Sequence, residues 1–190
     1  MAEKFRNKYR SATSRLSGYD YTRNGAYFVT ICTRTKIPCL GKIVDDKMIL
    51  SDIGIIVKGY WMEIQDHFPD IYLDEFIIMP DHIHGIIIIN PKIKLNSNHL
   101  QIETPNLGVS TGTKSGNPYW KSNSIGSIIN QFKRICTIKT SHAGLDFTWQ
   151  PRFYDRIIRS NTELEFVRNY IRNNVINWTI NEHNDNSIDM

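Results

Sequence analysis

Cysteine is scarce in this sequence, and long apolar runs are absent. The three cysteines, Cys32, Cys39 and Cys136, are odd in number and form no C-x-x-C pair, so neither a disulfide framework nor a zinc knuckle is expected. No apolar run approaches the roughly 18 residues that a membrane-spanning helix needs, and the N-terminus has no apolar signal segment. These absences predict a cytoplasmic protein with reduced thiols and no membrane partner.

Positive charge is concentrated near the N-terminus. The net charge is only +4, but residues 1–24 carry six basic and two acidic side chains. Residues 25–180 carry 17 basic and 14 acidic groups, and residues 181–190 carry three acidic groups and no basic one. We therefore expect a basic arm at 1–24, one domain at 25–180 and an acidic tail at 181–190. Such an arm binds nucleic-acid phosphates or is simply a solvated tail.

Hydrophobic periodicity predicts three helices and a set of short strands. Strands are expected over residues 26–33, 71–79, 83–89 and 152–158, and a hairpin over 40–50 that turns at Asp45-Asp46. Apolar residues recur at helical spacing over residues 53–68, 125–136 and 164–178, with Ser51 and Ser160 as N-caps. Residues 91–123 lose this periodicity and are rich in Asn, Gly, Ser and Thr, which predicts a flexible inserted loop.

The order of these elements indicates the fold class. Strand, hairpin, helix, strand, strand, helix, short strand and helix follow one another without an internal repeat. This order fits a single-domain α+β fold of ferredoxin-like type, in which helices pack on one face of an antiparallel sheet.

Two histidines, His82 and His84, lie inside the most apolar strand. Side chains of a strand alternate, so both imidazoles project from the same face. Histidines near sheet ends often only satisfy structural partners, but two like-facing imidazoles repel one another when protonated and leave buried nitrogens unpaired when neutral. A shared cation removes both problems and keeps positions open for oxygen ligands, which is typical of a catalytic ion. The alternating-histidine nucleotide hydrolases of the HIT group would need a third histidine at Ile86, so they are excluded.

A helix near the C-terminus offers a partner for the histidine pair. Tyr170 and Asn174 are four residues apart, so they share one helix face beside the apolar stripe. Most tyrosines serve packing, and only the surrounding sequence favours a reactive role for this one.

That surrounding sequence resembles a known family. His82-Ile83-His84 matches the HUH signature of single-strand endonucleases, and residues 170–174 resemble the nucleophile helix of their single-tyrosine branch. The likeness is to the REP-associated tyrosine transposases, the transposase IS200-like group, and it covers most of the chain. It is carried further by residues 15–21, 25–30, 79–85, 125–133 and 149–158.

The resemblance implies a ferredoxin-like domain that cuts single-stranded or hairpin DNA and joins to it covalently, as a monomer or homodimer. By it, His82 and His84 hold Mg²⁺ or Mn²⁺, and Asn174 completes the metal site where related transposases have a glutamine. Tyr170 is then the nucleophile. Two departures matter: Val175 stands where members often have proline, and the Gly-Arg-Pro arm motif of some relatives is absent, which leaves the DNA target undefined.

The chemistry follows from what a phenol can do. A phenol is a poor nucleophile at neutral pH, so an ion must polarise the scissile phosphate and stabilise the developing charge. Attack gives a 5′-phosphotyrosine and a free 3′-hydroxyl, and the step is reversible because the ester keeps the phosphodiester energy. Basic side chains are expected to hold DNA phosphates or else to be merely solvated: Arg15, Lys133, Arg134, Arg152 and Arg156.

Two other functions remain open at this point. A minimal replication initiator or relaxase uses the same chemistry, although 190 residues leave little room for its additional domains. A non-catalytic DNA-binding protein derived from a transposase is the alternative from another class, and the joint presence of His82, His84 and Tyr170 argues against it.

Overall fold

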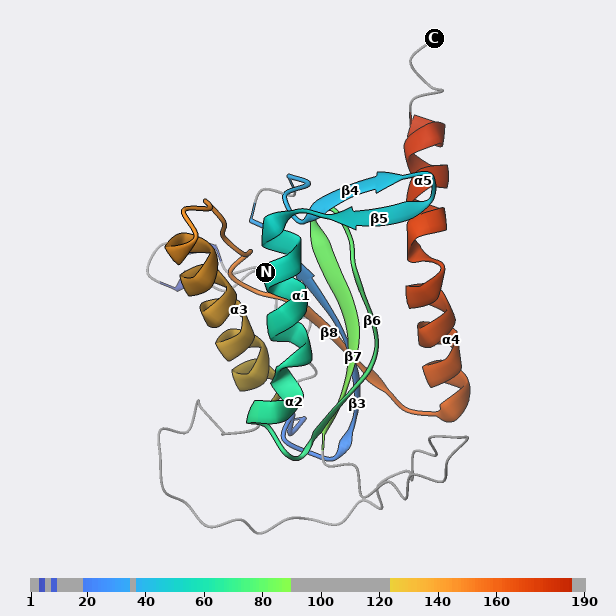
Figure 1. The fold of residues 1–190 in the computed structure, drawn as a ribbon. Helices are drawn as coiled ribbons and strands as arrows, with labels where there is room; N and C mark the ends of the chain where they lie inside the picture. The colour runs from blue at the N-terminus through green and yellow to red at the C-terminus, as the bar shows by residue number, and fades with distance from the viewer. Residues whose placement is uncertain (1–3, 6–7, 10–18, 35–36, 90–123, 186–190) are drawn as a thin grey trace.

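Four antiparallel strands form the central sheet, in the spatial order β6, β7, β3, β8 (Figure 1). The computed structural model describes residues 4–5, 8–9, 19–34, 37–89 and 124–185, with side chains described for 19–34, 37–89 and 124–179. The strands are β3 (Gly25–Cys32), β6 (Ile71–Ile78), β7 (His82–Ile89) and β8 (Tyr154–Ile158). β7, which carries both histidines, is therefore a central strand.

Helices cover both faces of the sheet, although the sequence analysis predicted helices on one face only. The helices are α1 (Asp52–Met62), α2 (Ile64–His67) and α3 (Ile125–His142) on one face and α4 (Asn161–Arg172) on the other (Figure 1). The cause lies in β7, where Ile83 and Ile87 point into one core and Ile86 and Ile88 into a second. A strand that is apolar on both faces must be covered on both. The predicted single-domain α+β fold with an antiparallel sheet is confirmed.

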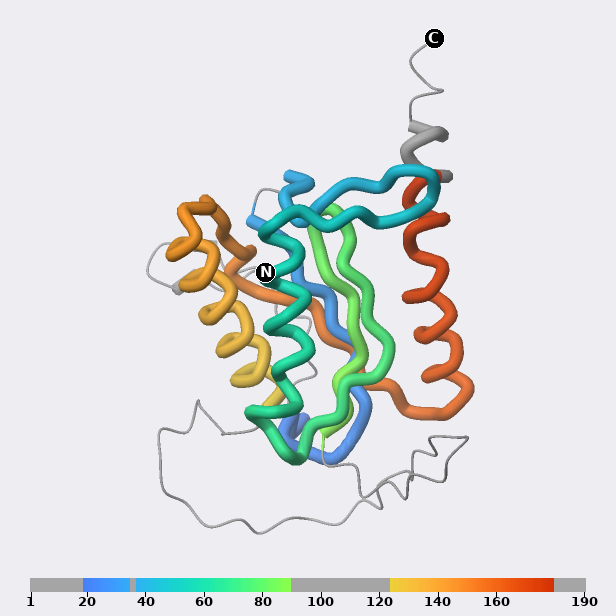
Figure 2. The backbone as a smooth tube through the Cα atoms, in the orientation of Figure 1, coloured from blue at the N-terminus to red at the C-terminus, as the bar shows by residue number. Residues whose placement is uncertain are grey.

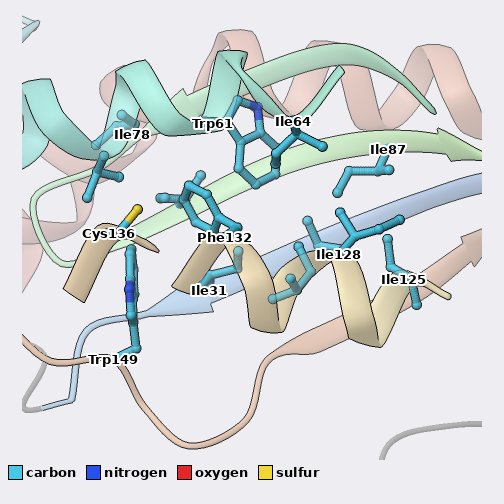
Figure 3. Packing of buried hydrophobic residues seen from close by; sticks show 14 of the residues in the cluster. Ile31, Trp61, Ile64, Ile78, Ile87, Ile125, Ile128, Phe132, Cys136 and Trp149 are labelled. Carbon is cyan, nitrogen blue, oxygen red and sulfur yellow. The ribbon is translucent and has the colours of Figure 1, made fainter. Parts of the chain in front are cut away.

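The larger core lies between the sheet and the helices α1 and α3 (Figure 3). Trp61 of α1 is fully buried, and its ring centroid lies 5.3 Å from that of Phe132 and 5.8 Å from that of Phe76. Gly85 allows this position, because a Cβ there would lie 2.3 Å from the Trp61 ring. The glycine beside His84 thus lets α1 pack closely against β7.

The predicted hairpin is confirmed. β4 (Gly41–Val44) pairs with β5 (Lys47–Leu50) through a two-residue turn, in which Asp45 and Asp46 have φ values of 49° and 54°, the left-handed values that such turns need. Near the N-terminus, β1 (Lys4–Phe5) pairs with β2 (Lys8–Tyr9). The predicted loop at 91–123 lies outside the described residues. Among the described helices, none is long and apolar enough to cross a membrane.

The C-terminal helical region differs from the single helix predicted over residues 164–178. α4 ends at Arg172 and α5 (Asn174–Asp185) begins after one residue, Asn173, whose φ and ψ are −92° and 4°. Backbone bonds of 3.1 Å from Asn173 N to Asn169 O and from Asn177 N to Asn173 O span the break, and the two helices run on as one column beside the sheet (Figure 2). Side chains four residues apart therefore stay on one side of it.

We predict that Gly85→Ala lowers the free energy of unfolding by about 1–3 kcal/mol, because an added methyl group overpacks the core against the ring of Trp61. Gly59→Ala is the matched control, since it lies in α1 and a Cβ there would meet nothing within 4 Å. It should leave stability unchanged or raise it by up to about 1 kcal/mol. Urea unfolding measures both variants, and a Gly85→Ala protein as stable as the parent would contradict the packing described.

Candidate functional site

The two histidines meet on one face of the sheet, as the strand alternation predicted. His82 is the first residue of β7, and the Nε2 atoms of His82 and His84 lie 3.1 Å apart. The central strand β3 runs beside them, with Cys32 opposite His82 and Thr30 opposite His84. This is the face that α4 covers, not the face of α1 and α3.

Each imidazole is held through its other nitrogen. Nδ1 of His82 lies 2.6 Å from Oδ1 of Asp81, and Nδ1 of His84 lies 2.8 Å from the hydroxyl of Thr30. An ionised carboxylate only accepts hydrogen bonds, so Nδ1 of His82 donates to Asp81 and its Nε2 keeps the lone pair when the ring is neutral. Both Nε2 atoms are thereby turned toward the same point. We did not predict either partner from the sequence, because Asp81 lies between the two strands expected over 71–79 and 83–89, and the cross-strand register of Thr30 cannot be read from the sequence.

Burial controls the charge of His84. Its side chain stacks on the ring of Phe28 at a centroid distance of 5.2 Å, and the residue is only 7% exposed. Burial, the largest cause, and the neighbouring His82 together lower the pKa of His84 to about 3, and Asp81 acts in the opposite direction. His84 is therefore a neutral imidazole at neutral pH, which is the form that binds metal ions.

Tyr170 reaches the histidine pair from α4. Its hydroxyl lies 3.3 Å from Nε2 of His84 in the same chain, and its ring meets that of Phe28 edge-on at 6.0 Å. Tyr170 is 40% exposed, so the hydroxyl lies at the border between the core and solvent. The predicted position of this tyrosine beside the apolar stripe of Leu164, Val167 and Ile171 is confirmed.

Two ion pairs fix α4 against the edge strand β6. Nε of Arg168 donates to Asp74 at 2.8 Å, and a terminal nitrogen of Arg172 lies 2.6 Å from Glu75. The register of β6 shifts between Leu73 and Phe76, so this irregularity contains both acidic residues. Arg168 and Asp74 are largely buried, and their pairing raises the pKa of Arg168 above its usual range. These contacts set the rotation of α4 and so the direction of Tyr170.

In the sequence, Asn174 lies midway between Tyr170 and Trp178, whose rings contact His84 and His82. Tyr170, Asn174 and Trp178 follow one another at four-residue intervals along the α4–α5 column. Trp178 contacts His82, with ring centroids 5.7 Å apart, and Asn174 is buried. Trp178 is the last residue of the apolar spacing predicted over 164–178, and in the structure it is half-buried beside His82.

The predicted basic residues do not gather at this site. Arg15 lies outside the described residues. Arg134 and Arg152 are exposed, but α3, which carries Arg134, packs on the opposite face of the sheet. Arg156 is exposed on β8 on the same face as the histidines and forms an ion pair of 2.7 Å with Glu163.

Lys133 requires a correction, because its side chain is not solvated. The residue is buried, and its Nζ donates to the carbonyl oxygens of Gln150 and Arg152 at 2.8 and 2.7 Å. Burial lowers its pKa to about 8. Lys133 therefore ties α3 to the segment before β8, a role that helical periodicity alone could not reveal.

The low pKa of His84 predicts that stability falls as the pH drops below about 6.5. An unfolded chain binds a proton on this imidazole near pH 6.5, whereas the folded protein does so only near pH 3. The unfolded state binds more protons between these values, so the free energy of unfolding should rise with pH across this window, by at most about 1.4 kcal/mol per pH unit from this residue.

Urea unfolding across this pH window measures the slope. The glutamine of His84→Gln cannot gain a proton. This variant should therefore lose the contribution of His84 to the slope of the free energy of unfolding against pH. Identical slopes for the parent and His84→Gln would show that His84 titrates normally in the folded protein.

Comparison with known proteins places the chain in a family. No protein-family profile matches it. The solved structure of the REP-associated tyrosine transposase bound to a REP hairpin aligns with a TM-score of 0.54 at 17% sequence identity, over 87% of this chain and 74% of that chain, which shows a shared fold. An uncharacterized protein of Haemophilus influenzae is 37% identical over 166 residues, 86% of this chain and 87% of that protein. The chain belongs to the same family as this Haemophilus influenzae protein.

Proposed function

We propose that the protein cleaves and rejoins single-stranded DNA as a transposase, with Tyr170 as the nucleophile and a divalent ion held by His82 and His84. The observation that carries the proposal is the hydroxyl of Tyr170, 3.3 Å from Nε2 of His84. Phosphoryl transfer needs a nucleophile and a centre of positive charge at one phosphate. The phenol would be the nucleophile, and the two convergent imidazole nitrogens would hold the ion that supplies the positive charge.

DNA with single-stranded or hairpin character is the proposed substrate. The REP-associated tyrosine transposase that shares the fold is bound to a REP hairpin, and we extend that class of partner to this chain. The six basic side chains within residues 1–24 are a further reason, because lysine and arginine gain affinity by replacing the counterions of phosphates.

The histidine pair fits a divalent ion. Two Nε2 atoms 3.1 Å apart are close enough to bind one cation, and burial keeps His84 in the neutral form that binds metal ions. Within the described residues no three His, Cys, Asp or Glu side chains are placed to hold a metal, so the amide of Asn174, water and the substrate phosphate would complete the ligand set of Mg²⁺ or Mn²⁺. Such an ion, when bound, polarises the phosphate and stabilises the charge that develops on it.

The reaction would then proceed by attack of Tyr170 on the phosphorus of the DNA. The phenolic oxygen of Tyr170 forms a bond to phosphorus, the bond from phosphorus to the 3′-oxygen breaks, the phenol gives up its proton to water and the 3′-oxygen gains one. The 5′-phosphotyrosine conserves the phosphodiester energy, so a 3′-hydroxyl can reverse the step. Phe28 positions the rings of both Tyr170 and His84.

We predict that the protein forms a denaturation-resistant adduct with a labelled hairpin that carries single-stranded flanks, in the presence of Mn²⁺. Tyr170→Phe removes the nucleophilic oxygen and keeps the ring against Phe28, so it should bind the hairpin like the parent and form no adduct. Gel electrophoresis under denaturing conditions measures the adduct, and peptide mapping should locate it on Tyr170.

Tyr154→Phe is the matched control. Tyr154 lies opposite Thr30, which lies opposite His84, so two strand spacings, about 10 Å, separate it from the histidines. Loss of the adduct in Tyr154→Phe but not in Tyr170→Phe would reassign the nucleophile. A hairpin that the parent binds with Mn²⁺ present and never cleaves would favour the non-catalytic DNA-binding function.

We also predict that the partners of the Nδ1 atoms raise the affinity for the ion. Asp81→Asn and Thr30→Val should each weaken Mn²⁺ binding by about 10- to 100-fold, and His84→Ala should abolish it. Isothermal titration of the protein alone with Mn²⁺ measures this without DNA. Asp146→Asn, at an exposed position, serves as the control for loss of one negative charge, and an Asp81→Asn protein with the affinity of that control would refute the role of Asp81.

A further inference from the structure

Exposed aromatic side chains are concentrated around the candidate site. In the part of the chain whose side chains are described, only three large aromatic residues are exposed: Tyr154 at 61%, Phe166 at 69% and Tyr170 at 40%. Tyr170 is the candidate nucleophile, and the other two come from β8 and α4. Exposed aromatic rings near a nucleic-acid site are available to stack on bases.

The strand register places Tyr154 in line with the histidine site. Tyr154, Thr30 and His84 are opposite one another across β8, β3 and β7, and residues paired in this way lie on the same face of the sheet. Arg156 occupies the next position on that face of β8, opposite Phe28, and its side chain is 67% exposed. β8 thus offers a ring and a positive charge beside the site.

Phe166 approaches the same region from α4. It precedes Tyr170 by four residues, so the two rings lie on one side of that helix. Glu163, one turn earlier, forms the ion pair with Arg156 of β8. This contact shows that this side of α4 borders β8, whereas Arg168 and Arg172 on its other side bind β6.

We propose that the surface formed by Tyr154, Arg156 and Phe166 binds the unpaired nucleotides that flank the cleaved phosphate. This inference rests on the proposed function and names the subsite that holds the single strand. Bases would stack on Tyr154 and Phe166, since every base has a face that stacks on an aromatic ring, and Arg156 would bind a backbone phosphate.

Arg156 can serve this role because its present ion pair is weak. Solvent screens the 67% exposed side chain of Arg156, so the pair contributes little to stability, and a phosphate can compete with Glu163 for the guanidinium. Oε1 of Glu163 bonds Arg156, while Oε2 accepts from the backbone N of Arg159 at 2.9 Å. The carboxylate therefore keeps a hydrogen-bond donor when Arg156 turns to the DNA.

An unstructured oligo-dT strand, titrated in EDTA with fluorescence anisotropy as the readout, tests the inference without cleavage. Tyr154→Ala and Phe166→Ala should each weaken binding about tenfold, and Tyr154→Phe should bind like the parent because it keeps the ring. Ile55→Ala is the matched control, since Ile55 is 59% exposed on α1, on the other face of the sheet.

The sharper measurement combines these variants with abasic positions in the strand. Removing bases should weaken binding by the parent. It should not weaken binding further in the Tyr154→Ala, Phe166→Ala double variant, because that variant has already lost the rings on which the bases stack. Equal oligo-dT affinity of the parent and the double variant, or no binding by the parent, overturns the inference. A double variant that changes only the oligomeric mass of the protein overturns it in favour of a protein interface.

The inference and the proposed function can fail separately. An adduct at Tyr170 in the double variant with undiminished oligo-dT affinity would leave the function standing and remove this subsite. Tenfold weaker oligo-dT binding by the double variant, in a parent that forms no adduct with a hairpin it binds, would leave the subsite standing and remove the catalytic function.

Discussion

The burial of both faces of β7 is the constraint on which the site depends. Ile83 and Ile87 require the cover of α1 and α3, and Ile86 and Ile88 require the cover of α4. Covering the second face brings α4 across the sheet on the side of the histidines. Tyr170 therefore meets His84 because the isoleucines of the same strand must be removed from water.

The same burial gives the histidines their chemical character. The two histidines stand at the beginning of β7, next to its isoleucines. The burial that stabilises the strand therefore also keeps His84 neutral. Asp81 and Thr30 hold the Nδ1 atoms and direct both Nε2 atoms to one point. Arg168, bound to Asp74, holds α4 in the rotation that turns Tyr170 toward that point.

Much of this arrangement could be predicted from the sequence, because it depends on local periodicity. The alternation of strand side chains predicts the shared face of the two histidines, and helical spacing predicts that Tyr170 and Asn174 share a side. What depends on cross-strand register or on the side of the sheet that a helix covers could not be predicted. The contact of Thr30 with His84 depends on cross-strand register. Lys133 was wrongly predicted because its carbonyl partners come from a distant segment of the chain.

Crystals of the protein grown with Mn²⁺ would test the central claim most directly, through an anomalous difference map. We expect one Mn²⁺ peak at about 2 Å from Nε2 of both His82 and His84, with the hydroxyl of Tyr170 from the same chain beside it. A peak elsewhere, or a bound ion with Tyr170 turned away and another tyrosine in its place, would contradict the account.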